Sequence, residues 1–259
     1  MIKPLFLVLA GDGINCERET ACAFELAGGN AHIMHINDLL ETPEMLNRYD
    51  GLALPGGFSF GDELGSGQIM ALKLRHGLGE SFFEFVNAQK PVIGICNGFQ
   101  VLVKLGLLPN PKTLERTVAL AANQQGGFIN RWVTVKVEKN TVCQWTRDLD
   151  FIDMPIRHGE GRIVLKDDNT FQSLQKNGQI AMTYLEDVNG SYERIAALCD
   201  ETGMVLGLMP HPEAHVYSAT YKTPVKNYMQ PGQGLRIFEN IVNVLTGRES
   251  EKIYAGQKN

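Results

Sequence analysis

Four short apolar runs, each followed by a stretch with helix signals, divide the first 105 residues of the chain. Runs of this kind are typical of strands that are buried on both faces. Repeated strand–helix–strand units predict an α/β fold with a mostly parallel central sheet and helices on both faces. The expected strands are residues 5–10, 31–36, 51–54 and 91–95.

Capping residues and apolar spacing place the helices between these strands. Asn15 is a candidate N-cap for a helix that ends at Gly28-Gly29. A short helix is expected after Thr42-Pro43. The other expected helices are residues 66–76, 79–88 and 97–105.

The second half of the chain alternates apolar and polar residues, which predicts a short antiparallel extension of the sheet. The expected strands there are residues 131–139, 179–185, 193–200 and 204–209, before a last helix at about 233–246. Residues 140–153 and 215–232 are interpreted as surface excursions. No repeat or linker is present, so residues 1–259 are expected to form one domain, with a core at about 5–246 and a polar tail at 247–259.

The strand at residues 91–95 runs directly into a helix, and the junction reads Gly94-Ile95-Cys96-Asn97-Gly98. This is the cysteine form of the G-x-S-x-G nucleophile elbow, in which glycines permit a tight, strained turn. Cys96 would then sit at the carboxyl end of the sheet, where open α/β folds bind ligands. The N-terminus of the following helix favours a negatively charged sulfur there. The alternative is a small buried core residue, and the spacing alone favours neither.

A cysteine nucleophile needs a base, and the base needs a group that orients it. The strand at residues 204–209 ends at Pro210-His211-Pro212-Glu213, which provides His211 as the base and Glu213 as its orienter. Taken alone, the pattern favours a histidine that merely ends a strand, with Glu213 in contact with solvent. The other candidates are His35, His76, His158 and His215, and of these His158 is the hardest to explain by structure alone because it can line a pocket.

Residues 55–62, which we call the glycine loop, follow the third strand with the sequence Pro-Gly-Gly-Phe-Ser-Phe-Gly-Asp. The backbone N–H groups of Gly57 and Phe58, together with that of Asn97, are expected to form an oxyanion hole. The loop matches neither the Walker Gly-Lys-Ser/Thr pattern nor G-x-G-x-x-G, which argues against a nucleotide phosphate loop.

Charge and cysteine content argue against several other classes of protein. A net charge of -5 without a basic run makes nucleic acid an unlikely partner. The apolar runs are far shorter than the roughly 20 residues of a membrane span. The five cysteines are scattered without a CxxC pair, so we expect free thiols, no metal site and a cytoplasmic location.

The order of a Pro-Gly-Gly loop, a G-x-C-x-G-x-Q motif that ends at Gln100, and a late His-Pro-Glu resembles class I (triad) glutamine amidotransferases, which have a flavodoxin-like fold. Within that class, four stretches are similar to the glutaminases of phosphoribosylformylglycinamidine synthases, which belong to purine biosynthesis. These stretches are residues 15–28, 56–62, 96–100 and 158–162, and the resemblance extends over about residues 5–246.

The resemblance implies that Cys96 attacks the side-chain amide of glutamine, that ammonia leaves, and that water hydrolyses the glutamyl thioester to glutamate. Gln100 and Phe58 would help to bind glutamine. Ammonia would pass to a separate synthetase subunit, which makes formylglycinamidine ribonucleotide and binds ATP and magnesium. A small bridging subunit is a further implied partner, and no cofactor is expected in this chain.

Three alternatives stay open at this point. The chain can serve a different amination, act as a stand-alone cysteine hydrolase or peptidase, or be a non-catalytic partner that keeps the fold. Stand-alone hydrolases lack the His-Pro-Glu pairing at a late strand end, and the presence of Cys96, His211 and Glu213 together argues against a non-catalytic protein.

Overall fold

The computed structural model of the chain describes residues 2–222 and 230–248. Its strands are β1 (Leu5–Ala10), β2 (Asn30–His35), β3 (Gly51–Leu54), β4 (Val92–Ile95), β5 (Val118–Ala122), β6 (Ile129–Val137), β7 (Phe151–His158), β8 (Glu160–Leu165), β9 (Ile180–Tyr184), β10 (Ile195–Cys199) and β11 (Val205–Leu208). Nine strands form one sheet in the order β2-β1-β3-β4-β11-β10-β9-β6-β7, and β5 pairs with β8 separately.

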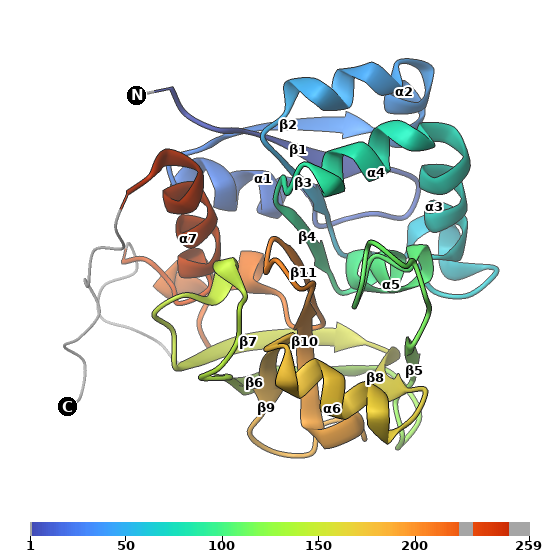
Figure 1. The fold of residues 1–259 in the computed structure, drawn as a ribbon. Helices are drawn as coiled ribbons and strands as arrows, with labels where there is room; N and C mark the ends of the chain where they lie inside the picture. The colour runs from blue at the N-terminus through green and yellow to red at the C-terminus, as the bar shows by residue number, and fades with distance from the viewer. Residues whose placement is uncertain (1, 223–229, 249–259) are drawn as a thin grey trace.

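Helices cover both faces of the parallel part of the sheet, as the apolar strands predicted. The α-helices are α1 (Glu17–Leu26), α2 (Ile36–Glu41), α3 (Gln68–Lys73), α4 (Glu80–Asn87), α5 (Asn97–Leu105), α6 (Asp168–Lys176) and α7 (Leu235–Thr246). Figure 1 shows α1 and α7 on one face and α3, α4 and α5 on the other. Phe24 of α1 joins the first layer, because its ring stacks on Phe6 of β1 and meets Phe238 of α7 edge-on.

Five adjacent strands, β2, β1, β3, β4 and β11, run parallel, which confirms the predicted α/β class. The placement of β11 in the antiparallel extension was wrong. It pairs in parallel with β4, with Leu208 opposite Ile95, and only its other edge pairs antiparallel with β10. The sequence Val-Leu-Gly-Leu is buried throughout β11, which is typical of a strand covered on both faces.

The antiparallel extension consists of β10, β9, β6 and β7. The sequence patterns identified β10, β9 and β6 but missed β7, as well as β5, β8 and α6. Pro155 interrupts the pattern of β7, and proline is tolerated there because β7 is an edge strand, where a missing N–H breaks no central ladder.

The interpretation of residues 140–153 as a surface excursion was wrong. Trp145 is fully buried, contacts the ring of Phe24, and donates from Nε1 to the carbonyl oxygen of Met204 at 2.9 Å. In the second expected excursion, His215 and Val216 are also buried, while residues 223–229 lie outside the described part of the chain. The expected polar tail is described only as far as residue 248.

Several helix ends differ from the prediction. Asn15 does not cap α1, because the helix begins at Glu17 and the cap position is Cys16, without a side-chain capping bond. The helix expected at residues 66–76 is split into α3 and a π-helical turn, Leu74–Leu78. The segment after Thr42 is a 3-10 helix, Pro43–Arg48, and α2 before it was not predicted.

The buried apolar side chains form one continuous cluster that joins the parallel half to the antiparallel extension. All five cysteines are free thiols, as expected. Among residues 2–222 and 230–248, no helix has the length and apolar character needed to cross a membrane.

Candidate active site

Cys96 lies at the junction of β4 and α5 in a strained backbone conformation, with φ 51° and ψ -103°. The glycines on either side are required by close packing. A Cβ on Gly98 would lie 1.8 Å from the carbonyl oxygen of Leu54, and one on Gly94 would lie 2.6 Å from that of Gly98. A strained cysteine between two such glycines is the geometry of a nucleophile elbow.

His211 follows β11 and contacts the carboxylate of Glu213, with 2.6 Å between Nδ1 and Oε1. Both side chains are almost fully buried. Burial by itself lowers the pKa of His211, but the Glu213 carboxylate and the nearby thiols of Cys16 and Cys96 outweigh it and raise this pKa well above its usual value. Nδ1 is engaged by Glu213, and Nε2 has no hydrogen-bond partner among the described residues, so Nε2 is the atom available to exchange a proton.

The edge strand β7 contacts both Cys96 and His211. The Sγ of Cys96 donates to the carbonyl oxygen of Arg157 at 3.7 Å, and the backbone N–H of His211 donates to that of Pro155 at 2.9 Å. Both acceptors belong to β7, which is four strands away from β11 in the sheet order. The sheet therefore curls so that β7 contacts both the nucleophile and the base.

The side chain of Asn97 ties the glycine loop to the start of α5. Its Oδ1 accepts from the backbone N–H of Ser59 at 3.2 Å, and its Nδ2 donates to Asp62 at 3.1 Å and to Gln100 at 3.0 Å. The sequence predicted a role only for the backbone of Asn97. The side chain explains why an asparagine follows the nucleophile here.

The three predicted oxyanion donors differ in their surroundings. The backbone N–H of Phe58 already donates to the carbonyl oxygen of Gly13 at 2.8 Å, so it is not free to bind an oxyanion in this arrangement. Gly57 has a φ of 143°, and a Cβ there would lie 2.6 Å from the same Gly13 oxygen. Gly57 and Asn97 remain the predicted donors.

The two residues predicted to bind glutamine have different surroundings. Gln100 is buried, and its Nε2 donates to the carbonyl oxygen of Glu160 at 2.7 Å, which ties α5 to β8. Phe58 is 47% exposed, and its ring lies against that of Phe128 with 6.2 Å between centroids. Contact of either side chain with glutamine stays a prediction.

Cys16 is a site residue that the motif analysis did not single out. Ligand-type atoms of Cys16, His211 and Glu213 all lie within 4.8 Å of one another, and all three residues are buried. Burial and the Glu213 carboxylate raise the pKa of the Cys16 thiol, against the opposing effect of His211. A thiol, an imidazole and a carboxylate are ligands that zinc accepts, so this group is able to hold a soft divalent cation.

The remaining histidines have structural surroundings, with one exception. His32 contacts the hydroxyl of Tyr49, His35 caps α2, His76 is exposed, and Nδ1 of His215 contacts the carbonyl oxygen of Asp153 at 2.7 Å. His158 is the exception. It is buried at the end of β7, and its Nε2 has no partner among the described residues.

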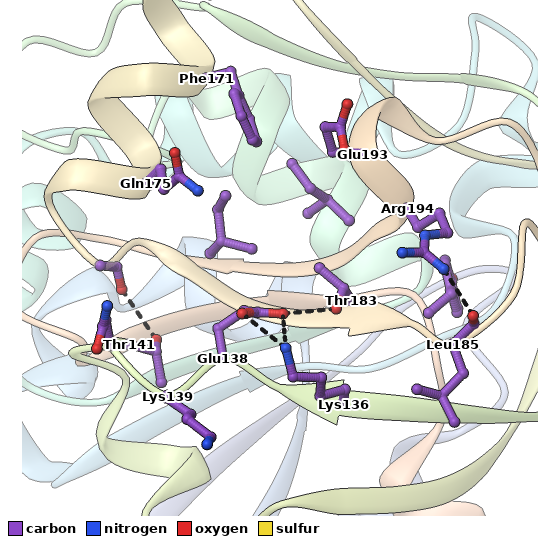
Figure 2. Close-up of a pocket in the computed structure, with 15 residues that line it drawn as sticks. Lys136, Glu138, Lys139, Thr141, Phe171, Gln175, Thr183, Leu185, Glu193 and Arg194 are labelled. Atoms are coloured by element: carbon purple, nitrogen blue, oxygen red, sulfur yellow. Dashed lines mark hydrogen bonds and ion pairs between the residues drawn. The ribbon is translucent and has the colours of Figure 1, made fainter.

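A groove of about 370 Å³ lies away from these residues, between α6 and the strands β6, β9 and β10 (Figure 2). Its lining carries both signs of charge, from Lys136, Glu138, Glu193 and Arg194. Lys136 pairs with Thr183, and both line the groove, whereas Cys96, His211 and Glu213 are not among its lining residues. The groove is therefore separate from the candidate active site.

Comparison with known proteins identifies related chains along almost the whole length. The family described as the CobB/CobQ-like glutamine amidotransferase domain matches residues 3–244. The phosphoribosylformylglycinamidine synthase subunit PurQ of Methanococcus maripaludis is 44% identical over 234 residues, which is 84% of this chain and 85% of that protein. The subunit of the same name from Dehalococcoides mccartyi is 37% identical over 249 residues, 93% of this chain and 98% of that one.

A solved structure, that of PurLQS from Thermotoga maritima, contains a chain with the same fold. The TM-score is 0.73 at 33% sequence identity, and the match covers 94% of this chain and 100% of that one.

Proposed function

Because the chain belongs to the CobB/CobQ-like glutamine amidotransferase family, we propose that it hydrolyses L-glutamine to glutamate and ammonia through Cys96, His211 and Glu213. The ammonia serves the synthesis of formylglycinamidine ribonucleotide in purine biosynthesis. The shared name of the relatives, at up to 44% identity over most of both chains, supports this pathway over a different amination.

In the first half of the reaction, His211 takes the proton of the Cys96 thiol and the sulfur attacks the side-chain amide carbon of glutamine. The backbone N–H groups of Gly57 and Asn97 stabilise the oxyanion that forms. The carbon–nitrogen bond then breaks, and the nitrogen takes a proton from His211 and leaves as ammonia. Glu213 holds the imidazole at 2.6 Å and stabilises its protonated form.

In the second half, the glutamyl group is bound to Cys96 as a thioester. His211 takes a proton from a water molecule, the resulting hydroxide attacks the thioester carbon, and the sulfur leaves. Glutamate is released and Cys96 regains its proton. The same imidazole thus acts as base and acid in both halves.

The synthetase that consumes the ammonia is a separate partner subunit in this proposal, joined by a small bridging subunit. ATP and magnesium bind to the synthetase, and the reaction takes place in the cytoplasm. The relatives support the subunit arrangement, since each is named as a subunit and is covered over 85% or more of its length.

One observation carries the proposal. The strained Cys96 and the His211–Glu213 pair come from two neighbouring strands, β4 and β11, and meet at their carboxyl ends. The test is glutamate release by the full chain with its synthetase partner, compared with Cys96→Ala. We expect release to disappear in the variant, and we expect 6-diazo-5-oxo-L-norleucine to form an adduct on Cys96 of the unmodified chain. Unchanged release in Cys96→Ala would disprove the assignment.

A further inference from the structure

The outer edge of β7 presents three alternate carbonyl groups to the candidate site. β7 is the last strand in the sheet order, and its other edge pairs with β6. Carbonyl groups of alternate residues in a strand point toward the same edge, at a spacing of about 6.7 Å. On this edge they belong to Asp153, Pro155 and Arg157. Their donors, in the same order, are Nδ1 of His215 at 2.7 Å, the backbone N–H of His211 at 2.9 Å and Sγ of Cys96 at 3.7 Å.

The first of these donors, His215, is a buried and neutral imidazole. The residue is 4% exposed, and burial lowers its pKa against the opposing effects of Asp153. The ring is therefore neutral near pH 7 and carries a single N–H proton. Because a carbonyl oxygen only accepts hydrogen bonds, that proton lies on Nδ1. The ring also stacks on Tyr221, with 5.1 Å between centroids, and meets Trp132 edge-on.

The carboxylate of Glu213 has little to orient it apart from its own backbone. Its Oε1 contacts Nδ1 of His211, and its Oε2 is buried without a hydrogen-bond partner among the described residues. The position of the carboxylate therefore depends on the short 3-10 helix Pro212–His215 that carries it. β7 holds this segment at both ends, through the backbone N–H of His211 and the imidazole of His215.

The acceptor of the His215 bond is itself fixed in place. The backbone N–H of Asp153 donates to Oε1 of Gln233 at 2.8 Å, and its carboxylate accepts from the hydroxyl of Thr134 on β6. The carbonyl oxygen of His215 accepts from the backbone N–H of Gly234, just before α7, at 2.9 Å. His215 thus joins the end of the 3-10 helix to β7 and to the start of α7.

We propose that His215 is a positioning residue for the glutaminase reaction, whose Nδ1–H bond to β7 fixes the 3-10 helix that carries Glu213. It acts through Glu213 and not on the reacting atoms. The inference rests on the proposed function, because it assigns a further residue to the same reaction. His211 becomes positively charged when it takes the proton of Cys96, and a carboxylate that is already in place stabilises this charge without reorganisation. Loss of the bond lets the carboxylate move, which lowers kcat and leaves the binding of glutamine intact.

Two variants of similar shape separate the hydrogen bond of His215 from its ring. His215→Asn keeps a donor, because its amide nitrogen is as many bonds from Cα as Nδ1, whereas His215→Leu has no donor. The full chain is assayed for glutamate release with the synthetase partner. We expect kcat to fall about tenfold in the Leu variant, with KM for glutamine within about twofold. The Asn variant should keep kcat within about threefold of the unmodified protein.

A double-mutant cycle tests whether His215 acts through Glu213. The change His215→Leu is made again in a Glu213→Gln chain. There we expect it to lower kcat by less than about twofold, because the charge that it positions is already absent. A purely structural role would give the same loss in both backgrounds.

Tyr221→Phe is the matched control from the same cluster. It removes the hydroxyl that contacts the Asp153 carboxylate, but it keeps the ring on which His215 stacks and leaves the Nδ1–H bond in place. We expect kcat to stay unchanged. Urea unfolding establishes that each variant is folded in the assay. If His215→Leu does not fold, His215→Gln replaces it, because its donor lies one bond farther from Cα.

Two results would overturn the inference. Equal values of kcat in the Asn and Leu variants would show that the Nδ1–H bond has no part in the reaction, since both variants lose the ring. A full tenfold loss from His215→Leu in the Glu213→Gln chain would show that His215 does not act through Glu213. If the unmodified protein itself showed no glutamate release that depends on Cys96, the proposed function would fail instead, so the two failures are distinguishable.

Discussion

Acidification is expected to destabilise the fold through His158. Burial and the charge of His211 lower its pKa from 6.5 to about 4, so the folded ring stays neutral at pH values where the unfolded chain takes up a proton. The unfolded state therefore binds more protons between these two pKa values, and the free energy of unfolding falls as the pH drops. From these values the loss is about 2 kcal/mol at pH 5 and about 3 kcal/mol when both forms are protonated.

Urea unfolding of the unmodified protein and of His158→Phe at pH 5, 6, 7 and 8 measures this contribution. His211 has the opposite sign, because its raised pKa gives stability that is present at low pH and is lost as the pH rises through its folded pKa. This contribution is present in both proteins and cancels in the comparison. The variant should be less stable at pH 7, because Asn123 loses its partner, but its decline from pH 7 to pH 5 should be smaller by about 2 kcal/mol. An equal decline in both proteins would refute the reasoning.

Three further changes probe the rest of the site. Gly98→Ala places a Cβ 1.8 Å from the carbonyl oxygen of Leu54, so we expect a loss of more than about 2 kcal/mol in thermal or urea unfolding; normal stability would contradict the packing. Glu213→Gln removes the charge that raises the pKa of His211, so the alkaline limb of the glutaminase pH profile should move to lower pH. We also expect kcat to fall at least about tenfold. An unchanged alkaline limb would count against the pairing of His211 with Glu213. Zn²⁺ should inhibit the glutaminase and EDTA should restore it, and Cys16→Ala should weaken this inhibition; equal sensitivity in the variant would exclude Cys16 as a ligand.

Local patterns predicted the parallel half of the fold and the residues of the candidate site that lie at its edge. β1, β3 and α5 have the predicted bounds, because each has a continuous apolar run or helical spacing with clear punctuation by glycine or proline. Cys96 could be recognised from five consecutive residues, since the elbow depends on short-range backbone geometry. His211 and Glu213 could be recognised as a pair because they are two residues apart in sequence and in contact in space.

Residues whose roles depend on long-range pairing could not be predicted in this way. The contact of β7 with Cys96 depends on the curl of the antiparallel extension, which leaves no local pattern, and Pro155 hides the strand itself. Trp145 is buried by packing against α1, far away in sequence. The bond from the backbone N–H of Phe58 to Gly13 likewise joins two separate turns, so a glycine-rich sequence alone does not reveal which N–H groups are free.

The burial of the candidate triad suggests how a partner could control access to Cys96. Cys96, His211 and Glu213 are 5%, 2% and 3% exposed, so little of these three side chains is open to solvent. Two segments lie against these residues, and each is tied to the first turn of α5. Asn97 holds the glycine loop, and Gln100 holds the turn between β7 and β8. A partner that docks on either segment can therefore change access to Cys96 through one or two hydrogen bonds, without rearranging the sheet that positions the base.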